Sequence, residues 1–149
     1  MQIRRSDDRV LLVGCVKSKQ SEERRAQDLY RSPLWRARRD YAHRSGSRWF
    51  ILSAFYGLLD PDDLIAPYDL ALADVPAAGR RAWAKAVAHS LEQRIGPLAG
   101  ITMEIHAGGT YRRALEPTLL ARGAVVSAPT AAIRGVGAQI AWYRAVADE

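Results

Sequence analysis

Polar side chains follow three separate apolar runs of the sequence, RVLLVGCV, RWFILSA and ITMEI. The first run leads into two lysines around a serine. The second contains a serine and precedes a tyrosine, and the third leads into a histidine, two glycines and a tyrosine. Lysines at a glycine-containing strand end suit a phosphate group, while histidine and tyrosine suit proton transfer and stacking. The predicted ligand-binding residues are Lys17, Ser18, Lys19, Ser53, Tyr56, Gly108 and Tyr111, and the predicted catalytic acid or hydrogen-bond donor is His106.

A long proline-bounded segment, FYGLLDPDDLIAPYDLALADVP (residues 55–76), supplies the candidate carboxylate. Tyr68 and Asp69 are the polar centre of its APYD motif, and long ordered loops of this kind often serve as lids. We expect Asp69 to be catalytic and Tyr68 to bind substrate. The alternative is that Asp69 holds the loop through nearby backbone amides, as aspartates commonly do.

The other candidates also have structural alternatives. Lys17 and Lys19 can be solvated loop residues, and the chain lacks the G-x-x-x-x-G-K-[ST] pattern of a P-loop. His106 can be a core histidine. Cys15 follows a predicted buried strand, so we expect it to be a small buried side chain rather than a nucleophile.

The elements that must position these residues alternate along the chain. Short aliphatic runs bounded by charge or glycine predict buried strands at residues 9–16, 48–54, 101–106 and 124–129. Helical segments lie between them. In one of these, Ser32 is a plausible N-cap, Pro33 suits the first turn and Gly46 closes the end.

This alternation predicts an α/β fold. Right-handed βαβ units would form a mainly parallel sheet of about four strands flanked by helices, in a single domain spanning residues 1–149. The turns after parallel strands gather at one edge of the sheet, where ligands bind in such folds. The polar residues named above are therefore expected at that edge.

Composition excludes several classes of protein. A single cysteine cannot form an internal disulfide, and no Cys/His cluster has zinc-site spacing, so neither a metal nor a cofactor is expected. No apolar run reaches the roughly 20 residues that a membrane span needs, and no apolar signal region follows the N-terminus. We expect a soluble, cytoplasmic protein without a membrane partner.

Positive charge is concentrated in the N-terminal third. Residues 1–50 carry 13 Lys/Arg against 6 Asp/Glu, whereas residues 51–149 carry 9 against 10. A localised basic face suits a phosphate-bearing partner, nucleotide or nucleic acid, although a solvated helix surface gives the same pattern. The predicted nucleic-acid contacts are Arg24, Arg25, Arg36, Arg38, Arg39 and Arg44.

Five segments, in a match that spans nearly the whole chain, together resemble a family of small bacterial, actinobacterial and phage proteins with a domain of unknown function. They are LVGCVKSK, DLYRSPLWRARRDYA, WFILSAFYGLLDPDDLIAPYDLAL, HAGGTYRRAL and GVGAQIAWY. That family is similar in turn to the YaaA peroxide-stress proteins, which bind DNA, and to domains attached to tRNA-guanine transglycosylase-like enzymes. The resemblance implies nucleic-acid or nucleobase-sugar chemistry. Family members often carry an acidic residue in this last motif, as GIGEQ, where this chain has Ala138.

These observations favour an enzyme that cleaves or exchanges the N-glycosidic bond of a nucleotide, nucleoside or base within nucleic acid. Asp69 would face the cationic sugar, His106 would donate to the departing base, Tyr56 and Tyr68 would stack, and Lys17 and Lys19 would contact phosphate. The alternative is a non-catalytic, YaaA-like basic protein that binds nucleic acid; a small-molecule stress enzyme is a third reading. A concave pocket holding the candidate residues would favour the enzyme, and a flat basic face would favour binding alone.

Overall fold

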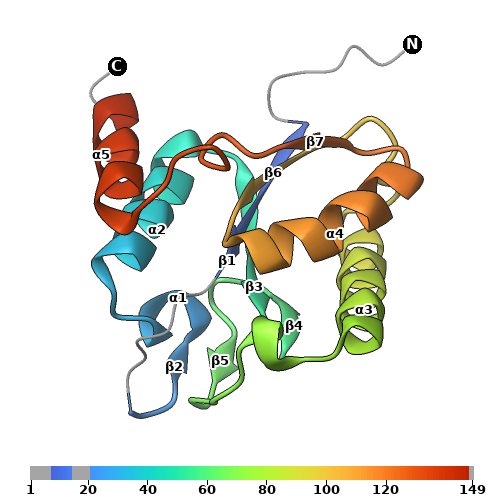
Figure 1. Cartoon of the computed structure of the whole chain (residues 1–149), viewed down its shortest axis with the longest axis horizontal. Coiled ribbons are helices and arrows are strands. Elements are labelled where there is room, and N and C mark those ends of the chain that lie inside the picture. The colour runs from blue at the N-terminus through green and yellow to red at the C-terminus, as the bar shows by residue number, and fades with distance from the viewer. Residues whose placement is uncertain (1–7, 15–20, 148–149) are drawn as a thin grey trace.

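Five strands form one sheet in the order β4-β3-β1-β6-β7 (Figure 1). The structure is a computed structural model that describes residues 8–14 and 21–147. The parallel strands are β1 (Arg9–Gly14), β3 (Arg48–Ser53), β6 (Thr102–His106) and β7 (Val125–Ser127). The predicted fold, a mainly parallel sheet flanked by helices, is confirmed. Cys15, Lys17, Ser18 and Lys19 lie outside the described residues.

The proline-bounded segment after β3 contains more regular structure than the sequence predicts. Its first residues turn back at Gly57, which has φ of 80°, into the antiparallel edge strand β4 (Gly57–Leu59). Further along, β5 (Leu64–Ile65) pairs with β2 (Arg24–Arg25) in a two-stranded ribbon, and a 3-10 turn, η1, spans Leu72–Asp74. These hydrogen bonds hold most of the segment against the body of the protein.

Helices cover both faces of the sheet (Figure 1). On one face, α3 (Ala77–Ile95) and α4 (Gly109–Ala121) pack on alternate strand residues such as Val10, Leu12 and Ile105. On the other, α1 (Ala26–Leu29) and α2 (Pro33–Ser45) pack on Leu11 and Val13, and α5 (Val136–Ala147) lies against α2. This two-sided burial explains why the strands are continuous apolar runs.

The ends of α2 follow the sequence signals. The side chain of Ser32 accepts a hydrogen bond from the Trp35 amide at 3.1 Å, Pro33 occupies the first turn, and Gly46 closes the helix with φ of 68°. A side-chain cap satisfies an amide that would otherwise lack a partner. The predicted start and end of this helix are confirmed.

The chain crosses to the opposite side of β1 midway through the fold. It builds β3 on one side of β1 and then, after α3, builds β6 on the other side. In open α/β sheets such a reversal leaves a crevice outside the carboxyl ends of the two strands concerned, and ligands bind there. Here those ends are Gly14 of β1 and His106 of β6.

Glycine is required at position 14 because the end of β1 and the residue after β6 approach each other closely at this crevice. A Cβ atom added to Gly14 would lie 2.5 Å from the Ala107 Cβ. We expect Gly14→Ala to lower the free energy of unfolding by about 1–3 kcal/mol, because the overpacked strands must move apart. Urea denaturation measures the loss.

Gly137→Ala is the matched control, since a Cβ there meets nothing within 4 Å. In a helix this change is expected to be neutral or stabilising by up to about 1 kcal/mol. Equal stability of the Gly14 variant and the wild type would contradict the tight contact.

Candidate functional site

The carboxyl ends of β3, β1 and β6 are level. Gly14 pairs with Leu52 of β3, and Val13 pairs with His106 of β6. Neighbouring strands are about 4.8 Å apart, so the ends of β3 and β6 lie about 10 Å apart across β1. This edge therefore brings the backbone of Ser53 and of His106 to within about 10 Å of one another.

Ser53 shapes the turn at this edge. It is fully buried, and its Oγ accepts hydrogen bonds from the amides of Phe55 and Tyr56 at 3.2 and 3.0 Å. Its carbonyl accepts a bond from Trp83 Nε1 at 2.9 Å, and the Trp83 ring contacts that of Tyr111 with centroids 5.4 Å apart. Ser53 and Tyr111 are thus joined through Trp83, and the Ser53 hydroxyl is engaged with the backbone.

Three rings form an aromatic shelf beside this turn: Phe55, Tyr56 and Tyr68. The centroids of Phe55 and Tyr56 are 4.8 Å apart, those of Tyr56 and Tyr68 are 5.5 Å apart, and Phe55 stacks on Tyr68 at 5.7 Å. The Tyr56 hydroxyl donates to the Ala66 carbonyl at 3.0 Å, which fixes the APYD motif to the shelf. Phe55 is 61% exposed, so one face of the shelf is open to a planar ligand.

Asp69 follows the shelf directly in the chain. Its side chain is exposed and makes no hydrogen bond or ion pair with the residues that the structure describes. The carboxylate is therefore not used to hold the loop by any described contact. It is exposed to solvent one residue along the chain from Tyr68 of the shelf.

The first turn of α4 lacks the residues that usually satisfy a helix N-terminus. Gly108 is the N-cap and has no capping side chain, and no acidic residue lies in the first turn. The first intrahelical bond is Arg112 N to Gly108 O at 3.1 Å, so the amides of Gly109 and Thr110 have no partner within the helix. Such a terminus favours an anion.

His106 is fully buried in a network of polar side chains on the α2 and α5 side of the sheet. Its Nε2 lies 2.7 Å from Glu104 Oε1, and its Nδ1 lies 2.8 Å from the Tyr143 hydroxyl. Tyr41 of α2 donates to Glu104 Oε1 at 2.6 Å, and Arg9 of β1 donates to Glu104 Oε2 at 3.0 Å. Both ring nitrogens of His106 are thus engaged within the protein.

The network fixes the protonation of its members. Burial would raise the pKa of Glu104, but hydrogen bonds from His106 and Tyr41, together with their neighbouring charges, lower it to about 2. Burial lowers the pKa of His106, against the opposing effect of Glu104. Burial also raises the pKa of Tyr41 and of Tyr143. Near neutral pH the histidine is therefore neutral, donating through Nε2 to the carboxylate and accepting the Tyr143 proton at Nδ1.

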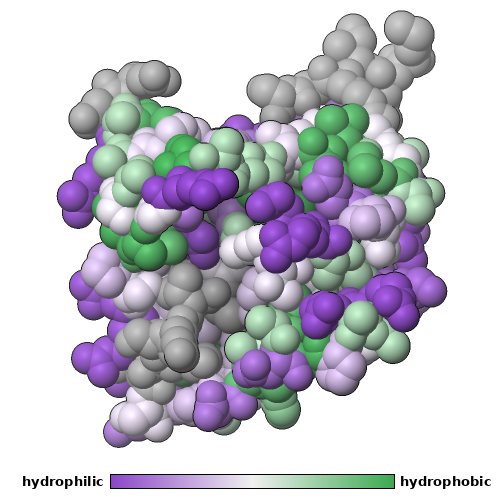
Figure 2. Space-filling view, viewed as in Figure 1, coloured by the Kyte–Doolittle hydropathy of each residue, from purple (hydrophilic) through white to green (hydrophobic). Residues whose placement is uncertain are grey.

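The predicted basic contacts do not all reach the surface. Hydrophilic side chains lie along the left edge of the space-filling view, on the side of α2 and α5 (Figure 2). Arg38 is an exception among the six candidates, since it is only 3% exposed and donates to the Gly14 carbonyl at 3.2 Å. Arg38 therefore holds the end of β1 from the side of the sheet that α2 covers. The candidates with exposed or partly exposed side chains are Arg24, Arg25, Arg36, Arg39 and Arg44.

Within residues 8–14 and 21–147, no group of three or more His, Cys, Asp or Glu side chains is arranged to hold a metal ion. In the same part of the chain, no helix has the length and apolar character needed to cross a bilayer.

Comparison with protein families identifies the chain's relatives. A family model described as a family of unknown function, DUF6884, matches residues 10–145. The chain belongs to this family. A search of curated proteins gives no match.

In this DUF6884 chain, sequence reasoning missed the residues that surround His106. Glu104 stands two positions before His106 on a predicted strand, and residues two apart share a face, so the pair could have been found from the alternation alone. Tyr41 and Arg9 give no such signal, because their contact with Glu104 depends on how α2 and β1 dock. Phe55 stands directly before Tyr56 at a predicted turn, and its exposure was not evident from the sequence.

The Glu104 network predicts a pH-dependent stability for the DUF6884 fold. Glu104→Gln should lower the free energy of unfolding at pH 7 by about 3 kcal/mol, because Arg9 loses its buried partner. The folded-state pKa of Glu104 is depressed, so its contribution is complete above the unfolded-state value near 4.5 and is lost as the pH falls toward 2. Protonation of His106, favoured in the unfolded chain, adds a loss that begins near its ordinary pKa of 6.5.

Glu92→Gln is the control for this measurement. Glu92 also accepts from an arginine, Arg122, at 2.9 Å, but its side chain is 40% exposed. Its loss should cost under about 1 kcal/mol. Urea denaturation from pH 2 to 8 gives both values, and an acid profile unchanged by Glu104→Gln would show that this carboxylate does not support the fold.

Proposed function

We propose that this protein binds a nucleotide unit, free or within nucleic acid, at the carboxyl edge of its sheet and cleaves or exchanges the N-glycosidic bond. The observation that carries the proposal is Asp69, an exposed carboxylate without described partners beside an open aromatic shelf. A structural aspartate would be expected to bond its own loop. A catalytic one must be free to meet substrate.

The shelf suits a nucleobase. Phe55 presents an exposed ring, and Tyr56 and Tyr68 hold it from behind. Stacking a base on such a ring is worth about 1–3 kcal/mol and accepts any base, because each has a π face. Tyr56 and Tyr68 thus serve mainly to position the open ring.

The neighbouring strand ends suit the phosphate. The uncapped first turn of α4, with Gly108 and Gly109, offers backbone amides next to the crevice between β1 and β6. A Cβ added to Gly108 would meet nothing within 4 Å, so the approach is open. In the sequence, Lys17 and Lys19 come immediately after β1, and we keep them as proposed phosphate contacts.

The proposed chemistry places positive charge next to Asp69. As the bond between the sugar carbon and the base nitrogen breaks, its electron pair leaves with the base and the sugar becomes cationic. The Asp69 carboxylate stabilises that cation, and in hydrolysis it takes a proton from the water whose oxygen bonds to the sugar carbon. A proton passes to the nitrogen of the departed base, so Asp69 is again a carboxylate and the products are the hydroxylated sugar and the neutral base. His106 acts in this proposal as a positioning residue, since its ring is fully buried and both nitrogens are engaged.

The resemblance to YaaA proteins, which bind DNA, and to domains attached to tRNA-guanine transglycosylase-like enzymes supports nucleic acid as the source of the nucleotide. A second candidate function is binding of nucleic acid without catalysis. The burial of His106 favours it, because it removes one of the two predicted catalytic side chains from direct contact with substrate. The two candidates differ in whether Asp69 is needed for a chemical step.

Asp69→Asn tests the enzyme. It keeps the shape of the side chain but removes the charge, so base release should fall by at least about 100-fold. The melting temperature should stay unchanged, because Asp69 has no described partner to lose. Mass spectrometry of bases and nucleosides released from modified and unmodified nucleic acid gives the activity.

Asp74→Asn is the matched control, an exposed carboxylate in η1 of the same segment. It should retain full activity. Full activity in the Asp69 variant would remove Asp69 from the mechanism. If the wild type releases no base from modified or unmodified nucleic acid, the enzyme proposal is wrong and the second candidate, binding without catalysis, stands.

Phe55→Ala tests the shelf. Losing the exposed ring should weaken binding of a single-stranded oligonucleotide by about tenfold, with little change in melting temperature. Leu64→Ala removes another exposed apolar side chain, 70% exposed on β5, and should leave affinity unchanged. Fluorescence anisotropy compares the two variants, and an equal effect of both would argue against a stacking role.

A further inference from the structure

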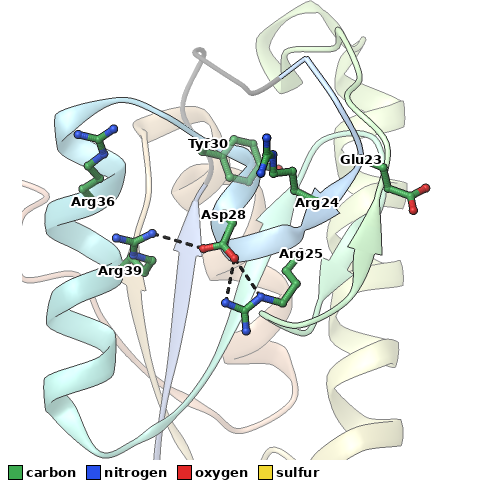
Figure 3. Close-up of a pocket in the computed structure, with 7 residues that line it drawn as sticks. All are labelled: Glu23, Arg24, Arg25, Asp28, Tyr30, Arg36 and Arg39. Atoms are coloured by element: carbon green, nitrogen blue, oxygen red, sulfur yellow. Dashed lines mark hydrogen bonds and ion pairs between the residues drawn. The ribbon is translucent and has the colours of Figure 1, made fainter.

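A hollow lined by arginines lies between α2 and the segment formed by β2 and α1 (Figure 3). Its volume is about 500 Å³. Arg24 and Arg25 approach from β2 and Arg36 and Arg39 from α2, with Asp28 and Tyr30 between them. We call this feature the arginine hollow. The four arginines place several positive charges around one hollow.

Asp28 compensates only part of this charge. Its carboxylate lies 2.9 Å from Arg25 and 3.6 Å from Arg39. The other carboxylate that lines the hollow, Glu23, points away from the remaining side chains (Figure 3). Beyond Asp28, Arg25 pairs with Asp62 at 3.0 Å and Arg39 with Asp40 at 3.6 Å, and Arg24 lies 3.9 Å from Glu22. Arg36 is therefore the arginine of the hollow that has no ion pair among the described residues.

Arg36 is the member best placed to meet a ligand. Its side chain is exposed and makes no ion pair or hydrogen bond with any residue that the structure describes. It lies one helical turn before Arg39 on α2, so the two guanidinium groups share one side of the helix. A pair of arginines at this spacing can clamp an oxyanion, and the fork geometry of guanidinium matches phosphate oxygens.

The hollow adjoins the aromatic shelf through two tyrosines. The hydroxyl of Tyr30, which lines the hollow, lies 2.7 Å from the hydroxyl of Tyr68, which belongs to the shelf. The ribbon of β2 and β5 joins the same two regions, since Arg24 pairs with Ile65 and Arg25 with Leu64. A ligand on the shelf therefore has the arginine hollow as its immediate neighbour.

We propose that the arginine hollow binds the phosphodiester next to the nucleotide whose base lies on the shelf. This proposal rests on the proposed function, and it makes the substrate a single-stranded polynucleotide rather than a free nucleoside or mononucleotide. A base on the shelf must be unstacked from its own strand and unpaired, which favours a single strand over a duplex. The adjoining phosphate then needs a cationic partner, and the hollow supplies one.

Arg36→Gln tests the hollow with a short single-stranded oligonucleotide as the probe. Anisotropy titrations at several salt concentrations should give about a tenfold loss of affinity. The slope of log affinity against log salt should become shallower by about 0.7, the value for one lost phosphate contact on a single strand. Arg44→Gln is the matched control, because Arg44 is an exposed arginine on the same helix outside the hollow. It should change affinity much less.

A second probe carries neutral methylphosphonate linkages in place of phosphodiesters. The wild type should bind it more weakly than the charged strand, and Arg36→Gln should reduce that difference while Arg44→Gln keeps it. Equal losses in the two variants would overturn the hollow in favour of a general basic face. So would wild-type binding of a nucleoside monophosphate as tight as that of the oligonucleotide, or tighter binding of a duplex.

Different results would contradict the proposed role of the hollow and the proposed reaction. If Arg36→Gln releases bases from the polymer at the wild-type rate and binds it equally well, the hollow is wrong and the reaction stands. If the phosphodiester preference depends on Arg36 but Asp69→Asn changes no activity, the hollow stands and the assigned chemistry is wrong.

Discussion

One buried carboxylate, Glu104, ties together the elements on which the candidate site rests. It accepts hydrogen bonds from Arg9 of β1, Tyr41 of α2 and His106 of its own strand, and His106 continues the chain to Tyr143 of α5. A charge taken out of water is costly unless its bonds are all made. The network therefore admits few arrangements of α2 and α5 over the sheet, because moving either helix would leave a buried polar group without its partner.

Contacts on both faces of the sheet also fix the strand ends at the crevice. Arg38, on the buried side of α2, donates to the Gly14 carbonyl at 3.2 Å. The last residue of β1 is thus held by a side chain whose helix is itself held by Glu104. At the opposite face, Trp83 joins Ser53 to Tyr111. Rigid polar contacts on one face and aromatic packing on the other fix the strand ends where a ligand would bind.

Much of this frame could be predicted from the sequence, because strand and helix patterns are local. The parallel strands, the caps of α2 and the shared edge follow from apolar runs and from Ser32, Pro33 and Gly46. Arg38 could have been separated from Arg39, since it lies midway between the buried residues Leu34 and Ala42 at helical spacing. The partners of Glu104 could not have been predicted from the sequence, because their contacts depend on the docking of elements that are far apart in sequence.

The exposed parts of the candidate site are built by different segments of the chain than its buried frame. The shelf and the arginine hollow are built by the segments after β1 and after β3, which pair with each other through β2 and β5 in a ribbon outside the main sheet. Tyr30 and Tyr68 join these segments a second time, and Tyr56 anchors the APYD motif through the Ala66 carbonyl. Because these contacts bridge the two segments, an anion that orders the arginines also restrains the chain that carries Asp69. Binding energy gained at a phosphate can in this way be used to orient a carboxylate several residues away, which is how remote contacts contribute to a chemical step.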